Sequence, residues 1–209
     1  MMVNKLCIWI IGSNSVGKTT QARLLHEYFA ELYGVQPNPQ LIKIQDKGLE
    51  VKLTTFSPFS VNLGDLTTSQ CGGTDTLGTK NQIISAYNLA LQISPVVIVE
   101  GIMATGQWID FLKRDGVHVI LIYLRMSDDL NFERLRNRRA IKKGINVEEV
   151  ILTEKTKDNV IGKLRGFESL YERMKNQCDY FMKVNVDQRL VFDVFDRIKI
   201  KLEKIILNL

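Results

Sequence analysis

The sequence predicts an α/β fold of three layers, in which a five-stranded parallel sheet carries helices on both faces. Short apolar runs alternate with longer segments whose apolar residues recur every three or four positions, the pattern of strands joined by helices. The chain has 209 residues, 45% of them hydrophobic, so we expect one domain spanning residues 1–209. No apolar run reaches the length of about 18 residues that indicates a membrane span, so no membrane partner is expected.

The first strand and the first helix flank a glycine-rich loop. Residues 6–11 are all apolar, as in a buried strand. Beyond the loop, Leu25, Phe29 and Leu32 have helical spacing, and Gly34 is a helix-stop residue. In a parallel sheet such a loop lies at the carboxyl end of a strand, where α/β proteins bind ligands.

The next segment contains a long polar loop. Residues 41–44 and 49–53 are short apolar stretches, and the second alternates like a half-exposed strand. Residues 57–80 are rich in Ser, Thr, Gly and Asp, and a loop of this length in a compact domain is usually functional.

Further strands and helices follow in alternation to the end of the chain. Strands are predicted at 96–99, 117–123 and 180–185, and helices at 83–91, 106–113, 128–141, 147–176 and 185–209. Gly162 and Gly166 weaken the long helix. The apolar stripe of the last helix either packs on the core or forms the seam of a homodimer.

The loop itself, Gly-Ser-Asn-Ser-Val-Gly-Lys-Thr, matches the phosphate-binding pattern G-x-x-x-x-G-K-[ST]. Its amides and the following helix N-terminus favour negative charge. Lys18 can reach the β- and γ-phosphates, and the Thr19 hydroxyl can bind Mg²⁺. The residues expected to bind the nucleotide are Gly12, Ser13, Asn14, Ser15, Val16, Gly17, Lys18, Thr19 and Thr20. The pattern predicts binding of ATP, with GTP possible because the loop contacts phosphates rather than the base.

Glu100 ends an all-apolar strand and should emerge at the same sheet edge as the loop. There it could hold Mg²⁺ together with Thr19, or orient the acceptor in a phosphoryl transfer. Acids at strand ends are also common for structural reasons.

Six cations, with no acid among them, follow the strand at 117–123. They are Arg134, Arg136, Arg138, Arg139, Lys142 and Lys143. Kinases with this loop carry a mobile lid at this place in the chain, and its arginines offset charge on the transferred phosphoryl group. We expect such a lid at about 128–150, with Arg134 and Arg138 as its catalytic residues. A solvated helix face or a contact to a nucleic-acid backbone are the alternatives.

A carboxylate that orients the acceptor hydroxyl and takes its proton is expected in the polar loop, and Asp75 is the first candidate. Asp65 is the second candidate. Asp75 could instead cap the helix that starts near Thr79.

The cysteines indicate a reducing compartment. Cys7, Cys71 and Cys178 are scattered, which favours the cytoplasm over a disulfide framework or a zinc site, and Cys7 is expected in the core. Residues 1–5 lead directly into a strand, so no secretory signal is expected. The net charge of +5 permits contact with a polyanion.

The order of phosphate loop, polar segment, strand ending in an acid and arginine-rich helix resembles the P-loop nucleoside and nucleotide kinases over most of residues 5–145. The resemblance implies a P-loop kinase domain with an acceptor-binding insertion at about 54–80.

Thymidylate kinases typically have Asp-Arg where this chain has Glu100-Gly101-Ile102, and the Asp-Gly-[Phe/Tyr]-Pro-Arg pattern of adenylate kinases is also absent. Both patterns supply an arginine for the acceptor's phosphate, so the acceptor is expected to offer an alcohol. The Glu-Gly-Ile element is similar to that of uridine kinases, although residues 57–78 do not match their acceptor loop.

Residues 73–77, Gly-Thr-Asp-Thr-Leu, resemble the phage-type kinases that phosphorylate 5-hydroxymethyluracil within DNA. This resemblance implies DNA as acceptor, a role for Asp75 as base or substrate contact, and the host cytoplasm as location if the gene belongs to a phage. The first alternative is a small-molecule kinase acting on a nucleoside or a (deoxy)nucleoside monophosphate. The second is a DNA-stimulated NTPase or switch, although the Asn-Lys-x-Asp motif of GTPase switches is absent.

Overall fold

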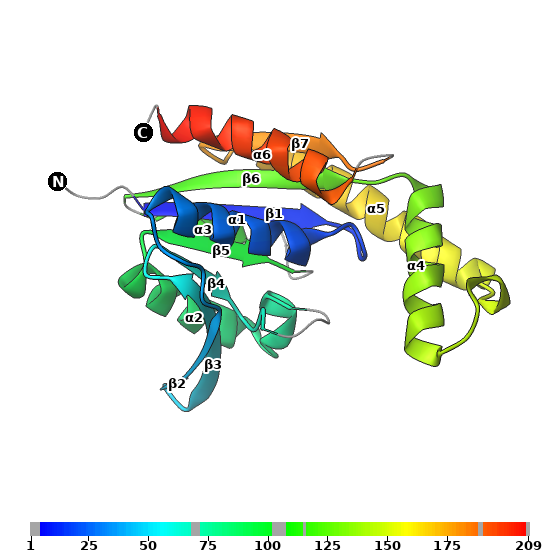
Figure 1. The fold of residues 1–209 in the computed structure, drawn as a ribbon, viewed down its shortest axis with the longest axis horizontal. Coiled ribbons are helices and arrows are strands. Elements are labelled where there is room, and N and C mark those ends of the chain that lie inside the picture. Colours follow the sequence, from blue (N-terminus) through cyan, green and yellow to red (C-terminus); the bar gives the residue numbers. More distant parts are fainter. Residues whose placement is uncertain (1–4, 68–71, 102–107, 115, 188–189, 208–209) are drawn as a thin grey trace.

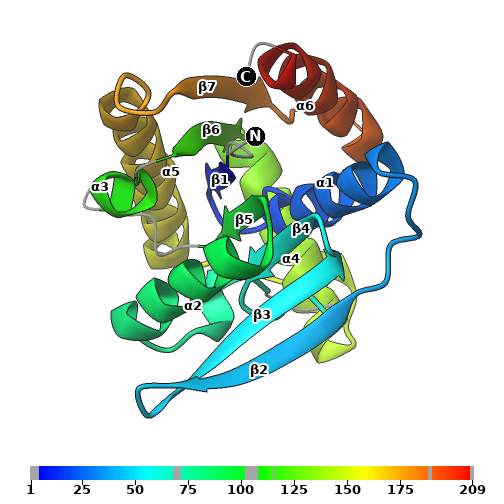
Figure 2. The same ribbon diagram turned by 90° about the vertical axis from the view of Figure 1, so that its left-hand side faces the viewer.

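The computed structural model describes residues 5–67, 72–101, 108–114, 116–187 and 190–207, which build a seven-stranded sheet with helices on both faces (Figures 1 and 2). The strands are β1 (Lys5–Gly12), β2 (Gln40–Asp46), β3 (Leu49–Ser57), β4 (Ser60–Leu63), β5 (Val96–Glu100), β6 (Val117–Arg125) and β7 (Tyr180–Asn185). The helices are α1 (Lys18–Leu32), α2 (Lys80–Ile93), α3 (Trp108–Leu112), α4 (Asp128–Lys143), α5 (Glu154–Met174) and α6 (Val191–Ile206), with short 3₁₀ turns η1 (Thr74–Thr76) and η2 (Val147–Glu149).

The α/β class is confirmed, whereas the prediction of a purely parallel sheet of five strands was wrong. In the order β2-β3-β4-β5-β1-β6-β7, the segment from β4 to β7 is parallel, but β3 and β2 are added antiparallel at one edge. Lys47 and Gly48 both have positive φ and close the β2–β3 hairpin in two residues. β4 lies inside the predicted loop, because its four residues are too few and too polar for a visible strand pattern.

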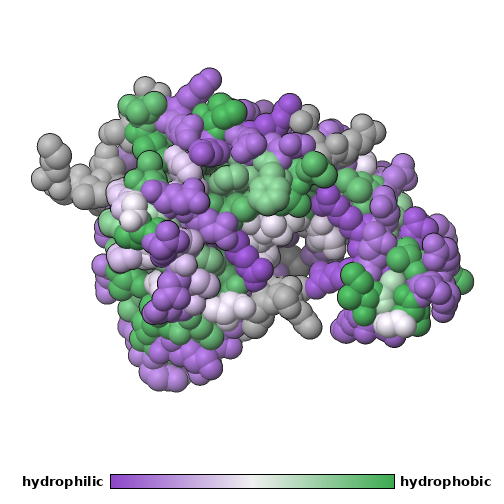
Figure 3. Space-filling model, viewed as in Figure 1, coloured by the Kyte–Doolittle hydropathy of each residue, from purple (hydrophilic) through white to green (hydrophobic). Residues whose placement is uncertain are grey.

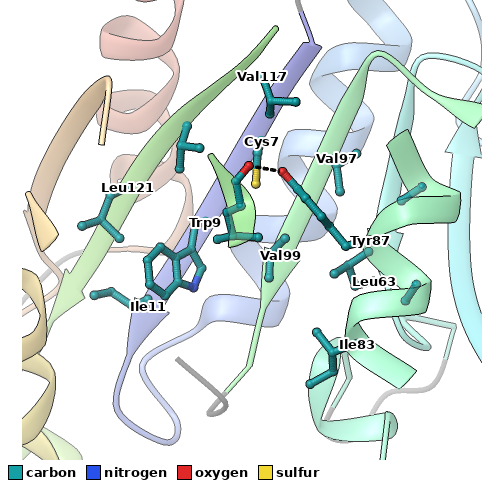
Figure 4. Close-up of a cluster of buried hydrophobic side chains, with 14 of the residues drawn as sticks. Cys7, Trp9, Ile11, Leu63, Ile83, Tyr87, Val97, Val99, Val117 and Leu121 are labelled. Carbon is teal, nitrogen blue, oxygen red and sulfur yellow. Dashed lines mark hydrogen bonds between the residues drawn. The ribbon is translucent and has the colours of Figure 1, made fainter. Parts of the chain in front are cut away.

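The central strand β1 explains why both faces of the sheet are covered. Cys7, Trp9 and Ile11 point into one apolar cluster, with α2 and α5, while the alternate residues point into a second cluster, with α1 and α6. Figure 4 shows Trp9 of the first cluster near Val99 and Leu121 of the neighbouring strands. Cys7 has no exposed surface, as predicted for a core residue. Burial of each large apolar side chain contributes about 1.5–3 kcal/mol.

Helix α4 begins and ends at residues that satisfy its free backbone groups. The Ser127 hydroxyl accepts from Leu130 N at the start of α4, and Gly144 ends α4 in the left-handed conformation. The segment predicted as one helix at 147–176 is split, because Thr153 caps a new helix, α5. Gly162 and Gly166 lie within α5, where an added methyl group would meet no neighbour.

The terminal helix α6 begins at Val191 rather than at 185, since residues up to Asn185 belong to β7. Its Val194, Ile198 and Leu202 are buried in the second cluster. The apolar stripe therefore packs on the core of its own chain.

Helix α4 projects from the carboxyl end of the sheet, as Figure 1 shows. Ala140, Val150 and Leu152 form a small separate core there, on the side of α4 that packs against η2 and the start of α5. The predicted lid segment at 128–150 thus has a local core of its own. Among the described helices, every one is too short or too polar to cross a bilayer.

Candidate functional site

The glycine-rich loop joins the end of β1 to the start of α1, as the sequence predicts. Gly12 has φ +150°, and a Cβ there would come within 2.7 Å of Leu124 O. Gly17 has φ +102° in open surroundings, so backbone conformation rather than crowding requires glycine at this position. Ser15 also has positive φ, and Val16 anchors the loop in the core. The loop therefore curls in front of the α1 N-terminus, where an anion is favoured.

Lys18 is buried at the first position of α1. Its ammonium group donates to Gly12 O and to Ser13 O, both at 3.0 Å. The cation thus lies against the loop on the side where bound phosphates are expected. The Asn14 and Ser15 side chains are partly exposed and Thr20 is exposed at the surface of α1.

Thr19 and Glu100 meet at the carboxyl edge of the sheet. β5 pairs in parallel with β1, with Glu100 opposite Ile10, so the carboxylate reaches the first turn of α1. Thr19 Oγ1 donates to Glu100 Oε1 over 3.2 Å. A hydroxyl and a carboxylate oxygen in contact are the hard ligands that Mg²⁺ prefers.

Glu100 is only 2% exposed. Burial raises the pKa of its carboxyl to about 7; the positive charge of Lys18 opposes this shift and the negative charge of Asp75 adds to it. A cation between Thr19 and Glu100 would favour the ionised carboxylate, because opposite charge lowers a carboxyl pKa. The residues present therefore fit a magnesium-bound nucleotide.

A second buried ionisable group, His26, lies in α1 below this edge. It has no exposed surface, its Nδ1 is 2.8 Å from Ser60 Oγ, and its ring stacks on Phe56 at 4.5 Å. Burial lowers the pKa of His26 to about 3. His26 is therefore neutral in the folded protein at neutral pH.

His26 and Glu100 are expected to change stability with pH in opposite directions. The pKa of folded His26 lies below its unfolded value of 6.5, so its contribution is lost as pH falls from 6.5 towards 3. The pKa of folded Glu100 lies above its unfolded value of 4.5, so its contribution is present below 4.5 and is lost as pH rises towards 7. Between pH 7 and pH 5 each effect amounts to about 2 kcal/mol, and they nearly cancel.

Denaturant unfolding at pH 7 and pH 5 tests this balance. The Glu100→Gln variant should lose about 2 kcal/mol of unfolding free energy on going to pH 5, because the effect of His26 is then unopposed. His26→Gln should gain a similar amount, and His118→Gln is the control that should follow the wild type. A Glu100→Gln variant with the pH profile of the wild type would contradict the prediction.

Gly73 and Thr74 lie directly against Glu100. A Cβ on Gly73 would come within 2.3 Å of Glu100 Oε1, and one on Gly101 within 2.0 Å of Thr74 Oγ1. Thr74 Oγ1 donates to Glu100 O at 2.8 Å. The glycines that flank these contacts are therefore required by the close approach of two backbone segments.

Asp75 lies in η1, exposed, beside the Glu100–Gly101 pair. A Cβ on Gly101 would come within 3.0 Å of Asp75 Oδ1. The interpretation of Asp75 as a helix cap was wrong, because the Thr79 hydroxyl accepts from Gln82 N at the start of α2. Asp65 closes a local turn, with Oδ1 accepting from both the amide and the hydroxyl of Thr67.

Gly73→Ala is expected to be the most damaging single change in this loop. Its φ of +65° and the clash with Glu100 would displace the loop, at a cost of roughly 1–3 kcal/mol. Thermal melting of this variant should be compared with that of Gly78→Ala, where the added methyl group meets only Gln82 Oε1 at 3.4 Å. Equal behaviour of the two variants would contradict the prediction.

Of the arginines on α4, the structure brings Arg134 to the loop. Its Nη1 donates to Ser15 O at 3.2 Å and to Val16 O at 3.3 Å. Arg138 lies one turn further from the loop on the same side of the helix and is exposed. Arg136 lines a different pocket of about 830 Å³, together with Asp129, Glu133 and Asp187.

Two residues at the site were missed in the sequence. Asn131 Nδ2 donates to Ser13 Oγ at 3.0 Å, one helical turn before Arg134. Its i,i+3 spacing from Arg134 could have identified it. Arg23, one turn beyond Thr19, donates from Nε and Nη2 to Leu66 O and so holds the polar loop against α1.

Cys71, at the start of the Gly-rich motif, lies outside the described residues. The contacts of Gly72, Gly73 and Thr74 show that the rest of the motif meets Thr19 and Glu100. Loop, strand end and polar segment therefore converge on one place.

No protein-family model and no curated protein matches this chain. Among solved structures, one described as a molecular and structural characterization of the PezAT chromosomal toxin-antitoxin system of the human pathogen Streptococcus pneumoniae is similar to it, with a TM-score of 0.47 and 14% sequence identity. The match covers 90% of this chain and 72% of that one.

Proposed function

We propose that the protein is a P-loop kinase that transfers the γ-phosphate of ATP, or of GTP, to a hydroxyl group. The observation that carries this proposal is the contact between Thr19 and the buried Glu100, beside Lys18 and facing Asp75. Such a set combines a phosphate-binding loop, a pair of magnesium ligands and a carboxylate on the acceptor side, which are the parts that phosphoryl transfer needs.

Each residue then has a distinct task. Lys18 and the amides of the loop hold the β- and γ-phosphates in line with the acceptor. Thr19 and Glu100 would hold Mg²⁺, which supplies charge neutralisation on the phosphate oxygens when bound. Arg134, already hydrogen-bonded to the loop, offsets negative charge at the γ-phosphate. Asp75 orients the acceptor hydroxyl and accepts its proton.

The acceptor we favour is the hydroxymethyl group of 5-hydroxymethyluracil in DNA. The segment that resembles kinases of this kind, residues 73–77, lies against Glu100. Gly101 follows Glu100 where nucleotide kinases supply an arginine for an acceptor phosphate. Only a small residue fits this position, because a Cβ would meet Thr74 and Asp75. These contacts favour an alcohol over a phosphate as the attacking group.

We also propose a cytoplasmic location, which for a phage gene is the host cytoplasm. Cys7 and Cys178 are both buried free thiols. Burial raises the pKa of each thiol to about 12, so both remain unreactive there.

Transfer of radiolabel from [γ-³²P]ATP tests the proposal. DNA containing 5-hydroxymethyluracil, the free nucleoside and the nucleoside monophosphates are offered in parallel, with thymine DNA as control. Label on the modified DNA alone is expected. Label on small molecules alone would point to a nucleoside or nucleotide kinase, and release of phosphate stimulated by DNA without a labelled acceptor would point to an NTPase or switch.

A further inference from the structure

The side of α4 that faces the phosphate loop continues outward beyond Arg134. Asn131 and Arg134 touch the loop, and residues three, four and seven positions further lie on the same side of a helix. Arg138 and Ile141 are therefore aligned with Arg134, at about 6 Å and about 10.5 Å along the helix axis. Lys142 borders the same side. We call Arg138, Ile141 and Lys142 the outer face of α4.

The outer face is cationic and also carries an exposed apolar side chain. Ile141 is 83% exposed, although it lies between charged residues on a helix whose apolar side is already buried against Val150 and Leu152. Arg138 and Lys142 are exposed as well. The sequence contains no acid between residues 134 and 143. The outer face therefore combines two exposed cations with one exposed apolar side chain.

An indentation lies between α4 and the rest of the molecule, as Figure 3 shows. Arg134 lies next to the loop, on the side of α4 that faces the main body of the protein. A long acceptor held at Asp75 could extend along this indentation, past the outer face.

We propose that the outer face of α4 binds DNA, with Arg138 and Lys142 on backbone phosphates and Ile141 against a base step next to the acceptor nucleotide. The inference deepens the proposed function and rests on it for the choice of acceptor. The proposed contact requires a polymeric substrate. A free nucleoside held at Asp75 would not extend to Ile141, which lies two helical turns beyond Arg134 on α4.

Charge and shape favour DNA over other partners. Phosphates attract the two cations in a salt-dependent way, and each contact adds to the affinity without reading sequence. Isoleucine is among the apolar side chains that DNA-bending proteins insert between base pairs, where it partly unstacks them. An enzyme that acts on a base in duplex DNA has to take this base out of the stack. Arg138 and Lys142 would hold the DNA backbone while Ile141 unstacks the neighbouring base.

Fluorescence anisotropy with a labelled DNA duplex tests the surface without requiring any phosphoryl transfer. The double variant Arg138→Ala, Lys142→Ala should lower the slope of log affinity against log salt by about 2. Ile141→Asp should weaken binding on the order of 10-fold. Two matched controls should bind as the wild type does: Arg136→Ala, from the opposite side of α4, and Ile151→Asp, which replaces an isoleucine that is also 83% exposed.

A duplex with 2-aminopurine beside the 5-hydroxymethyluracil reports unstacking directly. The wild type should raise its fluorescence, and Ile141→Asp should not do so even at saturating protein. Equal losses in the outer-face and control variants, or no binding of DNA by the wild type, would overturn the inference.

These outcomes are independent of the kinase assay. If DNA is bound through the outer face but never labelled, the proposed function fails and the inference stands. If modified DNA is labelled and the outer-face variants bind it as the controls do, the inference fails and the function stands.

Discussion

Replacing Lys18 with alanine is expected to lower kcat/KM for phosphoryl transfer on the order of 10³-fold or more, about 4 kcal/mol of transition-state stabilisation. The ammonium group lies against the loop carbonyls of Gly12 and Ser13, where it can follow the charge that develops on the γ-phosphate. No other described lysine donates to this loop, so the loss has no local substitute. Turnover of γ-labelled ATP measures the effect.

The fold should survive this substitution, because Lys18 is outside both main apolar clusters. Circular dichroism should be unchanged, and Lys163→Ala on the exposed surface of α5 is the matched control for loss of a lysine. Full activity of a folded Lys18→Ala protein would mean that the donor site lies elsewhere.

Asp75→Asn is expected to lower the rate of the chemical step by roughly 10²–10⁴-fold, with little change in ATP affinity. Asparagine keeps the size of the side chain beside Gly101, but it cannot accept the proton of the acceptor hydroxyl. Single-turnover kinetics with saturating ATP separate the chemical step from binding.

Asp65→Asn is the matched control, since Asp65 was the other candidate base. Its carboxylate already accepts two hydrogen bonds from Thr67, so its loss should affect the stability of the loop more than the rate. If Asp65→Asn abolished the rate and Asp75→Asn did not, the roles of the two residues would be exchanged.

The features that the sequence predicted well are those fixed by local chemistry. The phosphate-loop residues occur in a strand–loop–helix segment, because each position has a backbone or charge requirement that few residues meet. Glu100 was found because an acid directly after the four apolar residues of a strand stands out, and parallel pairing with β1 brings it to the loop.

The features that were missed depend on contacts between distant parts of the chain. β4 is too short to show a pattern, and it becomes a strand only because β3 and β5 pair with it. Whether β2 and β3 run antiparallel depends on the Lys47–Gly48 turn rather than on the apolar pattern. Gly73 and Glu100 are in close contact although they are 27 residues apart in the sequence. Helix and strand periodicity cannot predict a contact over this separation.

The arginines of α4 likewise show which features the local sequence predicts and which depend on the folded structure. The density of arginines predicted a role for α4, but helix geometry decides which side chains reach the loop. Arg134 and Asn131, which the sequence pattern did not single out, donate hydrogen bonds to the loop, whereas Arg136 lines a pocket that contains three acids.

The two hydrogen bonds that Lys18 makes within its own loop have a consequence for selectivity. Under the proposed function, binding of a nucleotide is an exchange, in which phosphate oxygens replace the main-chain carbonyl oxygens of Gly12 and Ser13 as acceptors for the Lys18 ammonium group. The negative charge of a triphosphate favours this exchange, whereas a neutral hydroxyl does not. An unphosphorylated nucleoside present in excess would therefore be a poor inhibitor at this pocket, because it offers the lysine nothing better than what the lysine already holds.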